Sequence, residues 1–185
     1  MKHILAPILL LVFLFPTLAL SEEVTLEDLV ERKGLYYKKF TDVPFSGKVT
    51  GGGQGEIKNG KREGPWVSYF ANDQLWDKGD YKNGEREGPW VSYFENGQLD
   101  SKGTWKNGKE EGPWVGFFDN DQLETKGNFK DGLEEGPWVQ YYDNGQLYWK
   151  GEYKNGKKEG PWESYNDDGQ SDEFTGTYKN DVKVD

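Results

Sequence analysis

Short runs of apolar and polar residues alternate along residues 55–180, and Asn and Gly separate the runs. The run Pro-Trp-Val-Ser-Tyr-Phe at 65–70 has the composition of a strand, and residues 74–82 have that of a returning strand. Asn72-Asp73, which is Asn-Gly in other copies, stands between them, and Asn83-Gly84 follows the second run. Asn-Gly is a strong hairpin signal because both central residues of such a turn need a positive φ. The pattern predicts antiparallel strand pairs joined in a continuous meander.

This pattern has a period of 24 residues, because Gly-Pro-Trp recurs at 64, 88, 112, 136 and 160. Units starting near these residues form a repeat array over 51–180, followed by a tail at 181–185. The fifth unit departs from the others, since Glu163 replaces a valine and Ser171 replaces a leucine. A degraded terminal unit is typical of the cap of a repeat stack. The expected fold class is all-β: an elongated, curved antiparallel β-meander of 24-residue hairpin repeats.

The turns also predict a register within each unit. If Asn72-Asp73 is a two-residue loop, Trp66 lies opposite Gly79, and the large ring is expected to cover that glycine. Proline has no N–H, so its ladder position should be unpaired or bulged. If Asn83-Gly84 is a two-residue loop as well, the sheet would slip by two residues per unit and twist or curl. The predicted structural residues of the repeat are Trp66, Trp90, Trp114, Trp138, Trp162, Gly79, Gly103, Gly127 and Gly151.

The other face of the predicted sheet carries an aromatic side chain at one repeating position. Lysines stand beside these aromatics, and a row of glutamates lies at the strand ends. Protein interfaces favour Tyr and Trp, so the aromatics are candidate partner-binding residues. Stabilisation of cross-strand pairs would account for them equally well. The candidate residues are Tyr69, Tyr93, Phe117, Tyr141 and Tyr165.

Residues 1–21 have the pattern of an export signal peptide. A short positive start precedes an apolar run from Ile4 to Leu20, and small residues lie before a cleavage point after Ser21. The predicted location is periplasmic or extracellular, and an uncleaved N-terminal membrane anchor is the alternative. Residues 22–50 should form a short helix over 22–33, with a capping box from Thr25 to Asp28, and two strands that cap the array.

Composition removes several function classes. The net charge of −10 excludes nucleic acid as a partner and disfavours contact with membrane lipid. The chain has no cysteine, and its only histidine, His3, lies in the predicted signal. Asp77, Glu173 or the repeated glutamates could form carboxylate pairs, but nothing singles out one copy. The turns at 119–122 and 166–169 offer oxygen ligands for calcium but lack an EF-hand loop. No enzyme activity, catalytic residue, cofactor or metal is therefore predicted.

The phrase Gly-x-Tyr-Lys-Asn-Gly-Lys-x-Glu-Gly-Pro-Trp resembles the MORN-repeat motif. Glu-Asn-Gly-Gln-Leu at 95–99 is more similar to the bacterial variant of that repeat, which occurs in proteins described as YwqK-type antitoxin components of toxin–antitoxin systems. The resemblance covers residues 55–180 and implies a curved β-meander. It also implies protein scaffolding and, less securely, contact with membrane lipids. An exported chain departs from the antitoxin pattern, because it could meet only a toxin outside the cytoplasm.

Two functions stay open on the sequence. The first is a non-enzymatic exported protein-interaction scaffold with an unknown protein partner, because repetition creates a long surface of equivalent contacts. The second is an aromatic-rich glycan or cell-wall binding protein, whose rings would stack on sugars. Burial of the repeated tryptophans would distinguish the two functions, because a ring that is shielded by its glycine partner cannot stack on a sugar.

Overall fold

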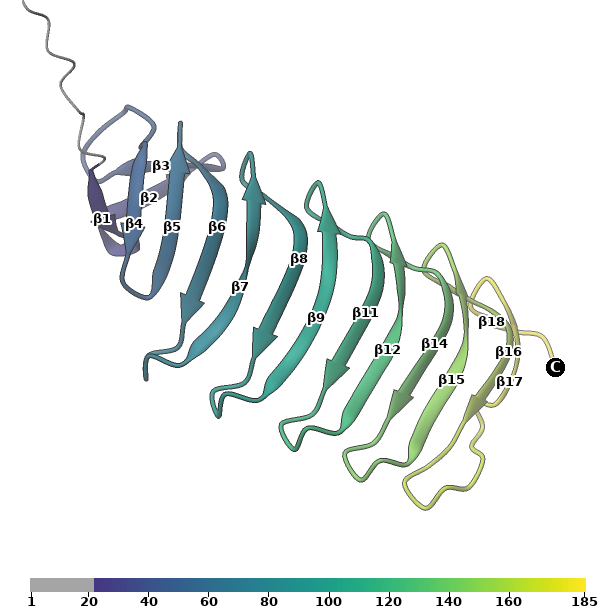
Figure 1. Ribbon diagram of the computed structural model, residues 1–185. Helices are drawn as coiled ribbons and strands as arrows, with labels where there is room; N and C mark the ends of the chain where they lie inside the picture. Colours follow the sequence, from purple (N-terminus) through teal and green to yellow (C-terminus); the bar gives the residue numbers. More distant parts are fainter. Residues whose placement is uncertain (1–21) are drawn as a thin grey trace, which may run out of the picture.

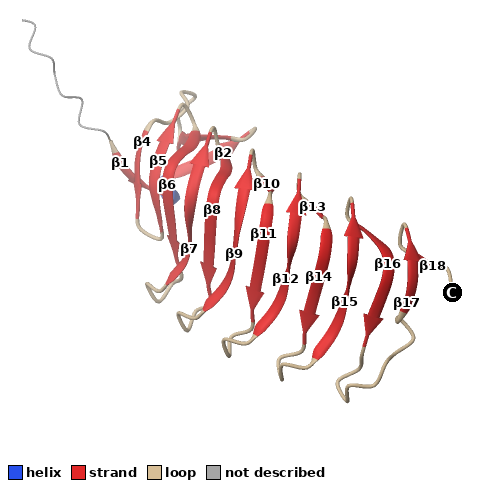
Figure 2. Cartoon of the chain, turned by 45° about the vertical axis from the view of Figure 1, so that its right-hand side comes forward, coloured by secondary structure: helices blue, strands red, loops and turns tan. Residues whose placement is uncertain are grey.

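A computed structural model describes residues 22–185, so the predicted export signal lies outside the described part of the chain. These residues form one long sheet and one two-stranded sheet, β2-β3. The strands of the long sheet lie side by side in chain order along an elongated array, antiparallel from β4 onwards (Figures 1 and 2). The all-β meander of repeated hairpins is thereby confirmed. The strands before the array are β1 (Glu23–Thr25), β2 (Leu29–Arg32), β3 (Leu35–Lys38), β4 (Gly47–Thr50) and β5 (Gly53–Lys58).

The strands of the array follow the 24-residue period of the sequence. Each repeat supplies one strand that contains Pro-Trp and one returning strand. The strands are β6 (Lys61–Tyr69), β7 (Leu75–Lys82), β8 (Glu85–Tyr93), β9 (Leu99–Lys106), β10 (Lys109–Glu110), β11 (Gly112–Phe117), β12 (Leu123–Lys130), β13 (Leu133–Glu134), β14 (Gly136–Tyr141), β15 (Leu147–Lys154), β16 (Lys157–Ser164), β17 (Gly176–Lys179) and β18 (Val182–Lys183).

The predicted helix over 22–33 is wrong. Only Leu26–Asp28 is helical, as a single 3-10 turn between β1 and β2. The expected bond of the capping box is present, because the backbone N–H of Thr25 donates to Asp28 at 2.9 Å. The following residues pair with β3 instead of extending the helix, and Gly34 belongs to the hairpin turn, with a φ of 75°. One capping pair could not outweigh strand pairing for so short a segment.

Two kinds of turn connect the strands of the array. At Asn83-Gly84, Lys82 pairs with Glu85 and both turn residues have positive φ, which confirms the predicted two-residue loop. At the other end, the N–H of Phe70 donates to the carbonyl of Gln74 at 2.8 Å, so the loop has three residues. The prediction of a two-residue loop at Asn72-Asp73 is therefore wrong.

A bulge after the three-residue loop preserves the predicted register further along the hairpin. Tyr69 pairs with Leu75, whereas Ser68 pairs with Asp77, so Trp76 is the extra residue of the bulge. Three-residue loops commonly carry such an irregularity. Because the bulge offsets the longer loop, Trp66 still lies opposite Gly79, as the sequence predicted.

The predicted slip of the sheet is also wrong, and Gly-Pro-Trp is the reason. Between β7 and β8 the pairing passes from Asp80–Glu87 to Lys78–Val91, so residues 88–90 face a single residue of β7. The two extra residues of this bulge offset the two-residue shift in register that the Asn-Gly turn would otherwise produce between repeats. Val91 then pairs with Lys102, which is the repeat equivalent of Lys78. Proline suits the bulge because it has no N–H to leave unpaired.

The tryptophans build a one-dimensional core along one face of the sheet, which we call the tryptophan face. Trp66, Trp90 and Trp162 are only 2–4% exposed. Each aromatic ring packs edge-to-face against the next one along the array, an arrangement that adds to the stability from burial. The continuous ladder consists of Trp66, Tyr81, Trp90, Trp105, Trp114, Phe129, Trp138, Tyr153, Trp162 and Tyr178.

Each tryptophan covers a glycine, but not the one that lies opposite it. A Cβ built on Gly79 would lie 2.3 Å from the ring of Trp90, whereas the ring of Trp66 lies over Gly55. The indole N–H of Trp90 donates to the carbonyl of Asp80 at 3.1 Å, which holds the ring over the preceding strand. Each tryptophan ring therefore covers a glycine as predicted, but the glycine belongs to the preceding strand, because the bulge directs each ring backwards along the array.

Non-repeat residues contact both ends of the ladder. At the start, the non-repeat residues Leu29 and Phe45 form a buried cluster with Trp66 and with Ile57, which is the repeat equivalent of Tyr81. At the end, Gly176 occupies the repeat position that would lie beneath a further tryptophan. A Cβ on Gly176 would meet Lys183 and Asp185, so the C-terminal tail lies where that ring would be. Pairing of β18 with β17 holds this tail, together with a bond from the backbone N–H of Val184 to the carbonyl of Thr177 at 2.9 Å.

Candidate functional site

The face opposite the tryptophan face, which we call the proline face, carries the predicted aromatic row. Strand alternation places Pro65, Val67 and Tyr69 on it, and Lys78 joins them because it pairs with Val67. The five predicted partner-binding aromatics are all partly exposed. The structure thus places the row on a single face, on or directly after every second strand of the array. These residues are Tyr69, Tyr93, Phe117, Tyr141 and Tyr165.

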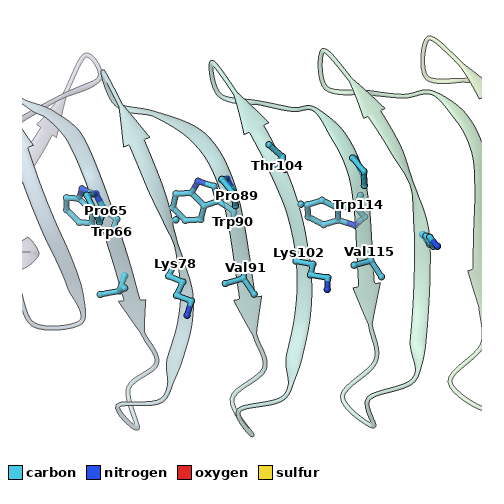
Figure 3. A pocket seen from close by; sticks show the side chains of 15 residues that line it. Pro65, Trp66, Lys78, Pro89, Trp90, Val91, Lys102, Thr104, Trp114 and Val115 are labelled. Carbon is cyan, nitrogen blue, oxygen red and sulfur yellow. The ribbon is translucent and has the colours of Figure 1, made fainter.

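A shallow groove runs along the proline face beside the aromatic row. Its first part has a volume of about 660 Å³ and extends from Pro65 to Lys126 (Figure 3). A second part of about 860 Å³ shares Pro113 and Lys126 with the first and reaches Pro161. We call the two together the proline groove. Prolines, valines, glycines and tryptophans of successive repeats line it, with one lysine from each returning strand.

The lysines of the groove differ in their partners. Lys150 pairs with Glu163 at 3.0 Å, and Glu163 also accepts a bond from the hydroxyl of Tyr165 at 2.7 Å. These two hydrogen bonds, that from Tyr165 foremost, lower the pKa of Glu163, while the pKa of Lys150 is raised. Among residues 22–185, no ion pair involves the equivalent residues Lys78, Lys102 and Lys126. In the degraded fifth repeat, Glu163 therefore neutralises the charge of the last lysine of the groove.

The prolines and valines of the groove were not predicted as site residues. Each proline is exposed and each valine is half-buried. The sequence carries a signal for them, because Pro and Val alternate with the buried tryptophan in every repeat. The proline that stands at the bulge also exposes its ring to solvent.

The glutamate row has a structural role. The carboxylate of Glu63 accepts a bond from the backbone N–H of Asn83 at 2.8 Å, and Glu111 does the same for Asp131 at 3.0 Å. Each glutamate thus ties its own repeat to the turn of the next. Asp77 is buried and pairs with Arg86 at 3.1 Å, while Glu173 is exposed near the C-terminus. The structure does not bring the proposed acidic residues together as one site.

The turns proposed for calcium use their oxygens within the fold. Asn120 accepts from the backbone N–H of Gln122 at 3.0 Å, and Asp121 accepts from Gln98 at 2.8 Å. Within the described part of the chain, no group of three or more His, Cys, Asp or Glu residues is arranged to hold a metal ion. No helix between residues 22 and 185 is long and apolar enough to cross a membrane.

One tryptophan departs from the repeat. Trp114 is half-buried, whereas Trp66, Trp90, Trp138 and Trp162 are buried. Its ring still lies over the preceding glycine, Gly103, but its indole nitrogen lies near Gly116, where other repeats have a serine or glutamine. The absence of a side chain at that position leaves room for the turned ring.

This repeated hairpin, with its tryptophan ladder, defines a repeat protein of the β-meander class. The family model described as MORN repeat variant matches residues 62–83, 86–107, 110–131 and 134–155. The chain therefore carries four repeats of the MORN repeat variant family. The degraded fifth unit, which begins near residue 160, lies outside the matched ranges.

The other comparisons add little. No curated protein matches this chain. Among solved structures, the crystal structure of the GtfA/B complex bound to UDP and GlcNAc aligns at 9% sequence identity and a TM-score of 0.22. The alignment covers 67% of this chain and 23% of that one, so this chain spans about a quarter of that protein's length. A likeness this weak has no bearing on fold or function.

Proposed function

We propose that the chain is a non-enzymatic, exported protein-interaction scaffold whose partner binds the proline face. One observation carries the proposal: the same partly exposed aromatic recurs beside the groove in five successive repeats. Repetition supplies many equivalent contacts to one partner, and partly exposed Tyr and Phe are suited to bury area without much loss of conformational entropy. The resemblance to YwqK-type antitoxin proteins would make a toxin outside the cytoplasm one such partner.

The burial of the tryptophans favours this proposal over the glycan-binding alternative. Trp66 and Trp90 are 2% and 4% exposed, and each covers a backbone glycine. Neither ring has a free face on which a sugar could stack. A glycan would have to use the smaller aromatics of the proline face, and the groove beside them is lined mainly by apolar side chains.

The proposed function is tested with a double substitution, Tyr93→Ala with Phe117→Ala. Proteins captured from the envelope fraction of the source organism by the full-length chain are compared with those captured by this variant. We expect a stoichiometric partner to be lost while the thermal unfolding midpoint changes little. Tyr148→Ala, which removes an exposed ring outside the row, serves as the control and should retain the partner.

Two outcomes would contradict the scaffold proposal. If the double variant unfolds at a much lower temperature, the rings serve cross-strand packing, as the alternative interpretation holds. If the chain captures no protein but binds immobilised glycans in a parallel array, the glycan-binding function replaces it.

A further inference from the structure

The proline groove has a chemical character that narrows the class of partner. Its floor is apolar, because exposed prolines and half-buried valines repeat along it. Figure 3 shows Pro65 on β6, Pro89 and Val91 on β8, and Val115 on β11, with Lys78 and Lys102 on the strands between them. A partner that lies along the groove therefore needs apolar groups at a matching interval.

The charge of the groove is opposite to that of the chain. The whole chain carries a net charge of −10, yet Lys78, Lys102 and Lys126 project from the groove without an ion pair among the described residues. The residues two positions further along the same strands are Asp80, Thr104 and Asn128.

The centre of the groove is thus positive. Thr104 and Asn128 are neutral beside the two central lysines, whereas Asp80 and Glu152 stand near its ends. At the far end, Glu163 already neutralises Lys150. Complementary charge selects partners and excludes wrong ones, so an acidic partner fits the middle of this groove.

The spacing of the lysines indicates the conformation of the partner. Equivalent residues are separated by two strands, which corresponds to about 9.6 Å across a sheet. A polyproline II helix advances about 9.3 Å in three residues, so every third side chain would meet a lysine. A β-strand repeats its facing side chain after about 6.7 Å, and an α-helix after about 5.4 Å. Only the polyproline II period matches that of the groove.

We propose that the proline groove binds an extended acidic peptide segment in the polyproline II conformation. An acidic side chain at every third residue pairs with Lys78, Lys102 or Lys126, and the prolines between them pack on the prolines and valines of the groove. This inference rests on the proposed function and specifies the chemistry of its partner. The pre-formed polyproline II helix loses little entropy on binding, which suits a shallow groove.

The test uses the full-length chain and a fluorescent peptide, (Glu-Pro-Pro)4, at low salt, with fluorescence anisotropy as the readout. Two comparison peptides are needed: (Lys-Pro-Pro)4, and a peptide of identical composition in which the glutamates are spaced alternately by two and four residues. We expect binding of the first peptide only, and weakening as the salt concentration rises.

Substitutions then locate the site. Lys102→Gln and Lys126→Gln should each weaken binding about two- to five-fold, as expected for the loss of one exposed ion pair. Lys106→Gln is the matched control, because Lys106 is exposed on the same strand as Lys102 but does not line the groove. It should leave the affinity unchanged.

Several results would overturn the inference. They are equal binding of the irregularly spaced peptide, binding of the lysine peptide, unchanged affinity after both groove substitutions, or no binding of (Glu-Pro-Pro)4 at millimolar concentration. Binding to polygalacturonate or to phosphatidylserine vesicles in place of the peptide would identify a polyanion site of another class. If the peptide fails while the Tyr93→Ala and Phe117→Ala variant still loses a captured protein, the scaffold proposal stands and only the peptide inference falls.

Discussion

Replacing Gly79 by alanine tests whether the tryptophan ladder requires a residue without a side chain beneath each ring. The new Cβ would lie 2.3 Å from Cδ2 of Trp90, well inside contact distance. The Trp90 ring cannot easily move, because it is 4% exposed, donates to the Asp80 carbonyl and packs against Tyr81 and Trp105. Overpacking of this kind costs about 1–3 kcal/mol, and loss of the indole hydrogen bond about 1 kcal/mol more.

We therefore expect Gly79→Ala to lower the free energy of unfolding by about 3 kcal/mol. For a chain of this length, that corresponds to a fall in Tm of about 6–12 °C. The assay is thermal and urea unfolding followed by circular dichroism. Gly52→Ala is the matched control, because its φ is not in the left-handed region and a Cβ there would meet no atom within 4 Å.

A double-substitution cycle decides which ring covers Gly79. Trp90→Phe shortens the ring and should offset part of the cost of Gly79→Ala, whereas Trp66→Phe should add to it independently. Coupling of Gly79 to Trp66, its partner in the register, would refute this account of the ladder. So would a Gly79→Ala variant as stable as the unsubstituted chain.

Two further substitutions test smaller features. Glu111→Ala removes the bond to the backbone N–H of Asp131 and should lower the free energy of unfolding by about 1 kcal/mol, measured in urea; an unchanged midpoint would contradict a stabilising role. The backbone N–H of Thr25 holds the pKa of Asp28 below its ordinary value, so its contribution is present above about pH 4 and is lost as the pH falls through the lowered pKa. Asp28→Asn should therefore reduce the acid sensitivity of the N-terminal segment, measured by amide hydrogen exchange between pH 5 and pH 2; an unaltered pH profile would contradict it.

The local patterns predicted most of the array because the signals lie close together in the chain. Asn83-Gly84 specified a tight turn through its need for positive φ, and the alternation around Trp66 specified which residues share a face. The short helix over 22–33 failed for the opposite reason. Its apolar residues suited a helix or a strand equally well, and pairing with β3 decided between them.

The candidate site was predicted only in part. The aromatic row follows from strand alternation, so its residues could be placed on one face without the structure. The groove could not be predicted from the sequence, because the prolines and valines that line it come from different repeats. Their separation depends on how neighbouring hairpins pair.

The sequence by itself determined the repeat, the strands and the positive-φ turn at Asn83-Gly84, and Trp66 lies opposite Gly79 because a bulge within the hairpin offsets its longer loop. These features depend on residues within one hairpin, where chain connectivity limits the alternatives. Only the tertiary structure decided that each tryptophan covers a glycine of the preceding strand, and that Gly-Pro-Trp forms a bulge that keeps equivalent lysines in line. Both depend on contacts between hairpins, where the pairing can shift and packing of the rings selects one register.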